Sequence, residues 1–201
     1  MVPIPLSLAY EDTLTGFAID KLLAATGGRY AIGGRYSRGG VGYLARTLPG
    51  FNAAAKGCPF LVIADLDNNP CPRALINSWL NTTQHPNLLV RIAVREVEAW
   101  LIADRHNFSQ FFGVPLARLP NDADAINDAK RFLVNLARTS RFAKIANAVA
   151  PPPGAPRSLG PDYNGTLSRF VAAHWDPHLA ASHSDSLRRA IARLQTFVPT
   201  W

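Results

Sequence analysis

The chain has 201 residues, of which 48% are hydrophobic, so it is long enough for one well-buried domain or for one domain with a small appendage. No run approaches the roughly 20 apolar residues of a membrane span, and the start of the chain lacks the basic segment and cleavage site of a signal peptide, so we expect a cytoplasmic protein that does not bind membranes. The 21 Lys and Arg residues outnumber the 14 Asp and Glu residues, and the resulting formal net charge of +7 favours a polyanionic partner such as DNA or RNA.

The first elements are predicted to be a strand, a helix and a short strand. The apolar residues 4–10 predict a strand, and Asp12 offers an N-cap oxygen to a helix at residues 14–25. Two glycines end that helix, and the short strand is predicted at residues 30–32. Glycines and arginines make up most of residues 33–42, which predicts a flexible, basic loop.

The middle of the chain contains the clearest strand. A helix is predicted at residues 43–56, with an interruption at Pro49. The continuous apolar run at residues 59–65 is typical of a central strand that is buried on both faces. The next predicted elements are a helix at residues 72–80, a strand at residues 87–95 and a helix at residues 96–113.

Beyond residue 115 the sequence contains no convincing strand pattern. Helices are predicted at residues 127–149, 166–174 and 184–197, with a stiff proline-rich linker at residues 151–156. Strands that alternate with helices indicate an α/β fold with a mostly parallel central sheet flanked by helices. We therefore expect an α/β core at residues 1–113 and a helical C-terminal extension at residues 114–201, packed on the core.

Acidic residues follow three of the predicted strands: Glu11 after the first, Asp65 and Asp67 after the apolar run, and Glu96 and Glu98 after the last. The carboxyl ends of parallel strands meet at one edge of a sheet, so we expect these side chains to share a pocket. Carboxylates this close repel one another unless a proton or cation intervenes, and hard oxygen ligands suit Mg²⁺ or Mn²⁺. The pattern predicts a divalent-metal site with Glu11, Asp65 and Asp67 as candidate ligands, although each acid alone is also compatible with a helix N-cap or a turn.

Glu96 and Glu98 are alternative candidates for one position in the pocket. Two positions along a helix correspond to about 200° of rotation, so only one of Glu96 and Glu98 is expected to face the pocket if both are helical. Glu96 is nearer the strand end, where its charge also complements the helix dipole. Glu98 lies in an apolar stretch beside Trp100, which slightly favours it as the pocket residue. Both are kept as candidate catalytic residues.

Basic residues form two candidate nucleic-acid contacts. The first comprises Arg35, Arg38 and Arg46, in or beside the glycine-rich loop, and the second comprises Lys130 and Arg131. The loop is not a phosphate-binding P-loop, because GxxxxGK[ST] is absent. Basic residues on a helix face are also common as plain solvated surface, so both interpretations stand.

Several motifs occur in the order of a known fold. Glu11 lies in AYEDTLTGF, the DLD motif spans residues 65–67, and REVEAWLIAD supplies two glutamates ahead of an apolar helix. In these motifs the sequence resembles the Toprim (topoisomerase and primase) fold, and within it the small bacterial Toprim-like proteins related to the nuclease domains of the OLD family. GPDYN at residues 160–164 and HWDP at residues 174–177 also look like parts of this subfamily, whereas Asp12 stands where the fold commonly has glycine.

The resemblance implies Mg²⁺-dependent phosphodiester chemistry, with Glu11 as general acid or base and Asp65 and Asp67 as metal ligands. The leading hypothesis is therefore a metal-dependent nuclease that acts on DNA or RNA. A second is a nucleic-acid-binding regulatory module that works with a partner, for example an ATPase in a defence-type system. A third is another DxD enzyme, a phosphatase or a nucleotide-sugar transferase, but the DxD motif is central and no sugar-binding motif stands out.

Overall fold

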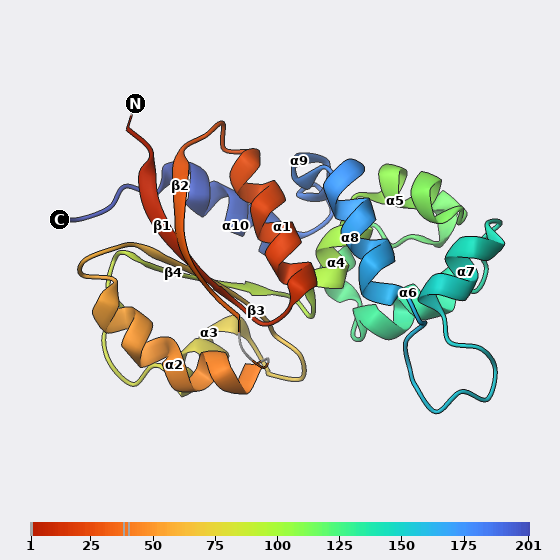
Figure 1. The fold of residues 1–201 in the computed structure, drawn as a ribbon, viewed down its shortest axis with the longest axis horizontal. Helices are drawn as coiled ribbons and strands as arrows, with labels where there is room; N and C mark the ends of the chain where they lie inside the picture. Colours follow the sequence, from red (N-terminus) through yellow and green to blue (C-terminus); the bar gives the residue numbers. More distant parts are fainter. Residues whose placement is uncertain (1, 38, 40) are drawn as a thin grey trace.

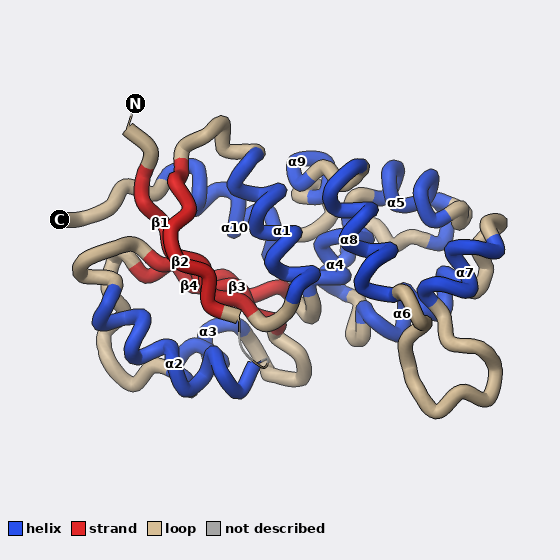
Figure 2. Tube along the Cα trace, in the orientation of Figure 1, coloured by secondary structure: helices blue, strands red, loops and turns tan. Residues whose placement is uncertain are grey.

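The protein is described by a computed structural model that covers residues 2–37, 39 and 41–201. Its centre is a sheet of four parallel strands in the order β2-β1-β3-β4 (Figures 1 and 2). The strands are β1 (Ile4–Tyr10), β2 (Tyr30–Tyr36), β3 (Phe60–Asp65) and β4 (Leu88–Ala93). Helices flank this sheet, so the predicted α/β class with a mostly parallel central sheet is confirmed.

The strand order reverses between β1 and β3. From β1 the chain moves to β2 on one side, and it then returns past β1 to β3 and β4 on the other side. In open α/β sheets, the crevice outside the carboxyl ends of two such strands is the usual place for a ligand. All six residues of β3 are buried, as the apolar run predicts for a strand covered on both faces.

Each face of the sheet has its own hydrophobic core. On one face, α1 (Thr13–Ala24) packs through Ala18, Ile19 and Leu22 onto Leu6 and Leu61. Helices α2 (Val41–Ala54) and α3 (Pro72–Trp79) cover the other face, and Figure 1 shows them on the opposite side of the sheet from α1. Right-handed crossovers explain why α1 and α2 cover opposite faces. The chain moves across the sheet in one direction from β1 to β2, and in the other direction from β2 to β3.

Two predictions about the region before β3 are wrong. Strand β2 continues through the two glycines to Tyr36, so only part of the predicted loop at residues 33–42 is a loop. Pro49 does not interrupt α2; it lies on the exposed side of the helix, where the main-chain carbonyl that a proline leaves unpaired is least costly. The candidate Arg38 lies outside the described residues.

The helix predicted at residues 96–113 is two helices, α4 (Val97–Ala103) and α5 (Arg105–Phe112). Asp104 separates them with a non-helical ψ of 67°. Its buried carboxylate accepts hydrogen bonds from the Asp176 N–H at 2.7 Å and from Asn107 Nδ2 at 2.8 Å. A long-range contact with the C-terminal part therefore ends a helix that the local sequence favours.

The C-terminal part is helical, as predicted, and packs on the same core as α1. The helix predicted at residues 127–149 is divided into α6 (Ala129–Ala137) and α7 (Ala143–Val149) by a turn that hydrogen-bonds back to Phe112 and Gly113. One core cluster includes Leu6 of β1, Leu133 of α6 and Phe170 of α8 (Tyr163–Ala173). The remaining elements are η1 (Leu116–Arg118), η2 (Ala123–Ala125), α9 (Pro177–Ala180) and α10 (Asp185–Thr196). Within the described residues, none of the helices has the length and apolar character needed to cross a membrane.

The C-terminal end of the chain is fastened to the start of β4 by Asn87, whose side chain is fully buried. Its Nδ2 donates hydrogen bonds to the carbonyls of Thr200 at 2.7 Å and Ala55 at 3.2 Å, and its Oδ1 accepts one from the Thr200 N–H at 2.8 Å. These bonds satisfy polar groups that would otherwise be buried without partners.

We expect Asn87→Ala to lower the free energy of unfolding by about 2–3 kcal/mol, because it leaves buried main-chain groups unpaired. Urea unfolding followed by circular dichroism measures the change. The control is Asn81→Ala at an exposed position, which should stay within about 0.5 kcal/mol of the parent. Equal losses in the two variants would show that the Asn87 bonds contribute nothing specific.

Candidate active site

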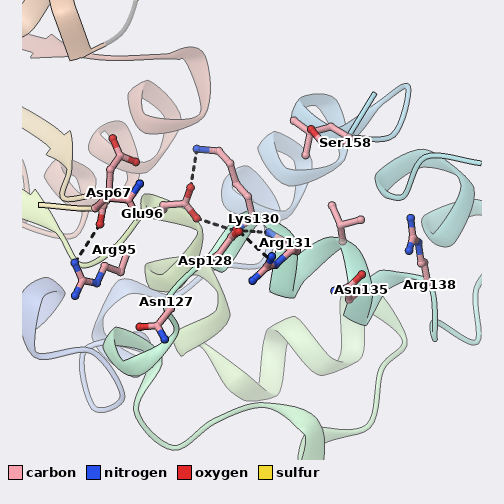
Figure 3. Close-up of a pocket in the computed structure, with 13 residues that line it drawn as sticks. Asp67, Arg95, Glu96, Asn127, Asp128, Lys130, Arg131, Asn135, Arg138 and Ser158 are labelled. Carbon is pink, nitrogen blue, oxygen red and sulfur yellow. Dashed lines mark hydrogen bonds and ion pairs between the residues drawn. The ribbon is translucent and has the colours of Figure 1, made fainter. Parts of the chain in front are cut away.

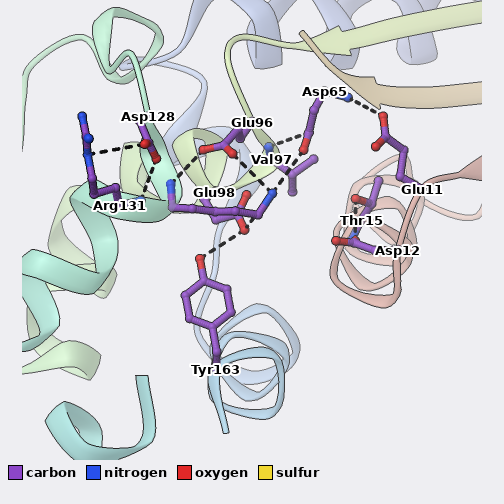
Figure 4. Close-up of polar contacts among 11 residues, drawn as sticks. Glu11, Asp12, Thr15, Asp65, Glu96, Val97, Glu98, Asp128, Arg131 and Tyr163 are labelled. Carbon is purple, nitrogen blue, oxygen red and sulfur yellow. Dashed lines mark hydrogen bonds and ion pairs between the residues drawn. The ribbon is translucent and has the colours of Figure 1, made fainter. Parts of the chain in front are cut away.

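The acids that follow β1 and β3 lie at the point where the strand order reverses (Figure 4). Glu11 directly follows β1, and its Oε1 accepts a hydrogen bond from the Asp65 N–H at 3.0 Å. Asp65 is the last residue of β3, and its Oδ1 accepts a bond from the Val97 N–H, at the start of α4, at 2.9 Å. The predicted meeting of these two acids is therefore found, and main-chain N–H groups fix one oxygen of each.

Glu96 and Glu98 both lie at the same cluster; the expectation that only one would do so assumed that both are helical, and this condition is not met. Glu96 is the N-cap residue of α4 and has extended backbone angles, φ −140° and ψ 156°, so the helical rotation between the two positions does not apply. Glu98 is in the first turn and only 2% exposed. Both carboxylates approach Lys130.

Lys130 supplies the positive charge at the centre of the cluster. Its Nζ lies 3.3 Å from Glu96 Oε1, and 3.7 Å from both Asp65 Oδ2 and Glu98 Oε1. Its main-chain N–H also donates to Glu96 Oε2 at 2.8 Å, and Figure 3 shows these two contacts with Glu96. The sequence predicts Lys130 as a nucleic-acid contact, whereas its side chain lies among the predicted catalytic carboxylates.

The cluster shifts the pKa values of its acids upward. Burial, followed by repulsion from Glu98, raises the pKa of Asp65 to about 8. Burial also raises the pKa of Glu98 to about 7, although Lys130 opposes the shift. Burial raises the pKa of Glu11 as well, and the charge of Asp67 adds to this. Burial lowers the pKa of Lys130, but the attraction of the carboxylates overcomes this effect and raises it above its ordinary value.

Tyr163 is a member of the cluster that sequence reasoning did not select. Its hydroxyl donates a hydrogen bond to Glu98 Oε1 at 3.1 Å, and the ring, at the start of α8, is buried. Burial and the charge of Glu98 raise the pKa of the hydroxyl, which keeps it protonated as a donor. Tyr163 belongs to the GPDYN motif at residues 160–164, but nothing in that motif indicates a contact with Glu98.

Asp67 takes a separate position. It is exposed and adopts φ +48°, the left-handed conformation that Asp tolerates better than most residues. Its N–H donates to the Arg95 carbonyl at 3.0 Å, and Arg95 Nη1 donates back to the Asp67 carbonyl at 3.1 Å. Because its charge acts on Glu11, Asp67 lies beside the cluster, but it does not pair with Lys130 in the structure.

A cleft of about 560 Å³ opens beside the cluster. Figure 3 shows Asp67 and Glu96 on one side, Lys130 and Arg131 on α6, and Ser158 across from Arg138. Its lining also includes Asn68, Arg95, Asn127, Asp128, Val134, Asn135 and Leu159. Of the predicted site acids, Asp67 and Glu96 line the cleft, whereas Glu11, Asp65 and Glu98 are not part of its lining. Arg131 and Arg138 add positive charge to it.

The predicted nucleic-acid residues fall into two places. Lys130 and Arg131 line the cleft, with Arg131 also paired to Asp128 at 3.4 Å. Arg35 lies on β2 and pairs with Asp20 at 2.7 Å, and Arg46 is exposed on α2; neither lines this cleft. Only the first pair is therefore brought next to the carboxylates.

The donors fit a divalent cation in type and charge. Three carboxylates pair with Lys130, and Glu11 lies next to them, so the acids outnumber the one lysine. Hard oxygen donors in such excess suit Mg²⁺ or Mn²⁺. Across residues 2–37, 39 and 41–201, however, no three His, Cys, Asp or Glu side chains converge closely enough to hold an ion as they stand, and Lys130 lies between the acids that come nearest.

No protein-family model matches the chain, and no curated protein sequence and no solved structure matches it either. The assignment of a function therefore depends on the geometry and charge of this site.

Glu98 is expected to make the stability of the protein depend on pH. Its pKa is raised on folding, so the folded protein holds a proton that the unfolded chain releases between about pH 4.5 and about pH 7. The free energy of unfolding therefore falls as the pH rises through this range. Glu98→Gln keeps an acceptor for Tyr163 and should stabilise the protein by roughly 1–3 kcal/mol at about pH 8, measured by urea unfolding without metal.

The groups whose charge or hydrogen bond acts on Glu98 include Lys130, Asp65, Glu96, Asp12 and Tyr163, all of which are unchanged in this variant. Asp122→Asn removes one exposed carboxylate outside the cluster and should leave the pH dependence of the parent intact. A Glu98→Gln protein with the same pH dependence as the parent would contradict the assignment.

Proposed function

We propose that the protein is a Mg²⁺- or Mn²⁺-dependent phosphodiesterase of the Toprim type that cleaves nucleic acid. The observation that carries this proposal is the gathering of Glu11, Asp65 and Glu98 from different elements at the carboxyl edge of the sheet, beside a cleft with basic residues along α6. This edge is where open parallel sheets place their reactive groups.

The chain supplies groups for binding, proton transfer and charge balance. A divalent ion held by Glu11, Asp65 and Asp67 would offset phosphate charge and lower the pKa of a water molecule. Burial raises the pKa of Glu11 above its ordinary value, which favours a role in giving and taking a proton. Lys130 lies where it balances carboxylate charge and attracts a phosphate at the mouth of the cleft.

The substrate class follows from charge. Arg131 and Arg138 line the cleft along α6, and the chain as a whole has a net charge of +7. Nucleic acid satisfies both observations through contacts to successive phosphates and release of counterions. We place the polymer along α6, with the bond to be cut beside Glu11 and Asp65.

One observation favours a second candidate, a nucleic-acid-binding module that does not cut alone and requires a partner such as an ATPase. The Lys130 ammonium lies within 3.7 Å of three carboxylates and compensates part of their charge without a metal. A site that is stabilised in this way can serve as structure rather than as catalyst. The two candidates differ in whether purified protein cleaves its ligand.

We expect Glu11→Gln and Asp65→Asn to reduce cleavage of DNA or RNA by at least roughly 100-fold with Mg²⁺ or Mn²⁺, because each removes a charge at the reacting edge. Gel assays of labelled single-stranded and duplex substrates measure the rate. Asp122→Asn is the matched control and should cleave at the parental rate.

Cleavage that survives in both cluster variants would rule out this catalytic centre. Binding without cleavage by the parent, even with Mn²⁺, would favour the regulatory module instead.

Binding can be tested apart from cleavage. We expect Arg138→Gln to weaken binding of an oligonucleotide in EDTA and to reduce the slope of log affinity against log salt by about 1, because one phosphate contact is lost. Fluorescence anisotropy at several salt concentrations gives both values. Arg46→Gln removes the same charge from α2, outside the cleft, so a similar change in both variants would show a general charge effect rather than a defined binding track.

A further inference from the structure

A second cleft, of about 570 Å³, lies over the outer edge of β4, between α3 and α10. It shares no lining residue with the cleft beside the carboxylate cluster. Ile76, Val90 and Ile92 give it an apolar lining, and arginines from three elements give it positive charge. A cleft of this size that combines apolar side chains with charged groups suits a small molecule that has both characters.

Arg91, in β4, is one of the three arginines that line this cleft. Its side chain is partly buried, and its Nε is buried and makes no hydrogen bond within the described residues. Burial lowers the pKa of this guanidinium, and repulsion from Arg193 lowers it further. A buried donor without a partner costs free energy, so the geometry calls for an acceptor that the described chain does not supply.

The other charges of the lining leave the cleft positive. Arg73, at the start of α3, is exposed and forms no ion pair within the part of the chain that the structure describes, whereas Arg189 pairs with Asp185 at 2.6 Å. Asp124 is occupied by Ser184 and Ser186, which donate to its carboxylate at 2.6 to 3.1 Å. The two acids of the lining are therefore already engaged.

The main chain of β4 adds donors at the same place. In the ladder with β3, the N–H of Phe60 bonds to the Asn87 carbonyl and the N–H of Leu66 to the Ala93 carbonyl. Because the ladder uses alternate residues, the N–H groups of Val90 and Ile92 point away from β3, toward the cleft. Within the described residues neither has a partner on that side.

Side chains close both ends of this open stretch of β4. Gln84 Nε2 donates to the Leu88 carbonyl at 2.6 Å, and Ser186 Oγ accepts from the Val94 N–H at 3.4 Å. The unpaired stretch is therefore short, with room for a small ligand group between Gln84 and Ser186.

We propose that this cleft binds an organic anion, a phosphate monoester or a carboxylate that carries an apolar body. Arg91 holds the anionic group, with Arg73 and Arg189 beside it, and the apolar body packs on Ile76 and Ile92. The site is separate from the proposed nuclease centre and does not depend on it.

Calorimetric titration of the full chain in EDTA with phenyl phosphate, benzoate and inorganic phosphate tests this proposal. We expect one of the two aromatic anions to bind about tenfold more tightly than inorganic phosphate, and the tighter one identifies phosphate or carboxylate as the preferred group. Arg91→Gln should weaken that binding about tenfold, with Arg91→Lys between it and the parent. Arg138→Gln, in the other cleft, should leave the affinity unchanged.

Arg73→Gln changes an exposed residue, so it tests the site even if Arg91→Gln does not fold, and it should weaken binding about threefold. The proposal is overturned if neither aromatic anion binds, if both Arg91→Gln and Arg73→Gln bind as the parent does, or if Arg138→Gln is the variant that loses binding.

Discussion

The candidate site depends on the ion pairs that the ammonium group of Lys130 makes with three carboxylates. This ammonium group comes from the first turn of α6, in the helical C-terminal part, and it meets carboxylates at the end of β3 and at the start of α4. Without it, Asp65 and Glu98 would be buried like charges, which proteins rarely tolerate. The charge balance of the sheet edge is therefore supplied by the helical part, just as one hydrophobic core extends across both.

Much of the sheet and its acidic edge could be predicted from the sequence, because local rules determine it. The buried strand before Asp65 follows from a continuous apolar run, and the start of α1 follows from Asp12, whose carboxylate accepts a hydrogen bond from the Thr15 N–H at 2.8 Å. The meeting of Glu11 with Asp65 follows from parallel strands that end at one edge. Each of these inferences needs only neighbours in sequence and a general rule of sheet topology.

The rest depended on contacts between residues far apart in sequence. Lys130 and Tyr163 reach Glu98 from 32 and 65 positions away, and no local pattern gives that distance or direction. Asp104 ends α4 because its carboxylate binds the N–H of Asp176. The helical rotation between positions 96 and 98 does not apply, because Glu96 is the N-cap residue of α4 and is not itself helical. In each case a tertiary contact or an end effect overrides a correct local rule.

The position of Lys130 in the chain also sets an order for synthesis. The strands and their acids leave the ribosome first, Lys130 follows, and Tyr163 comes later still. Until both have emerged, Asp65 and Glu98 lack the groups that allow burial, so they stay hydrated or hold protons. All four strands are therefore synthesised before Lys130 and Tyr163 can contact Asp65 and Glu98. The packing of these side chains at the edge of the sheet is then a late step of co-translational folding.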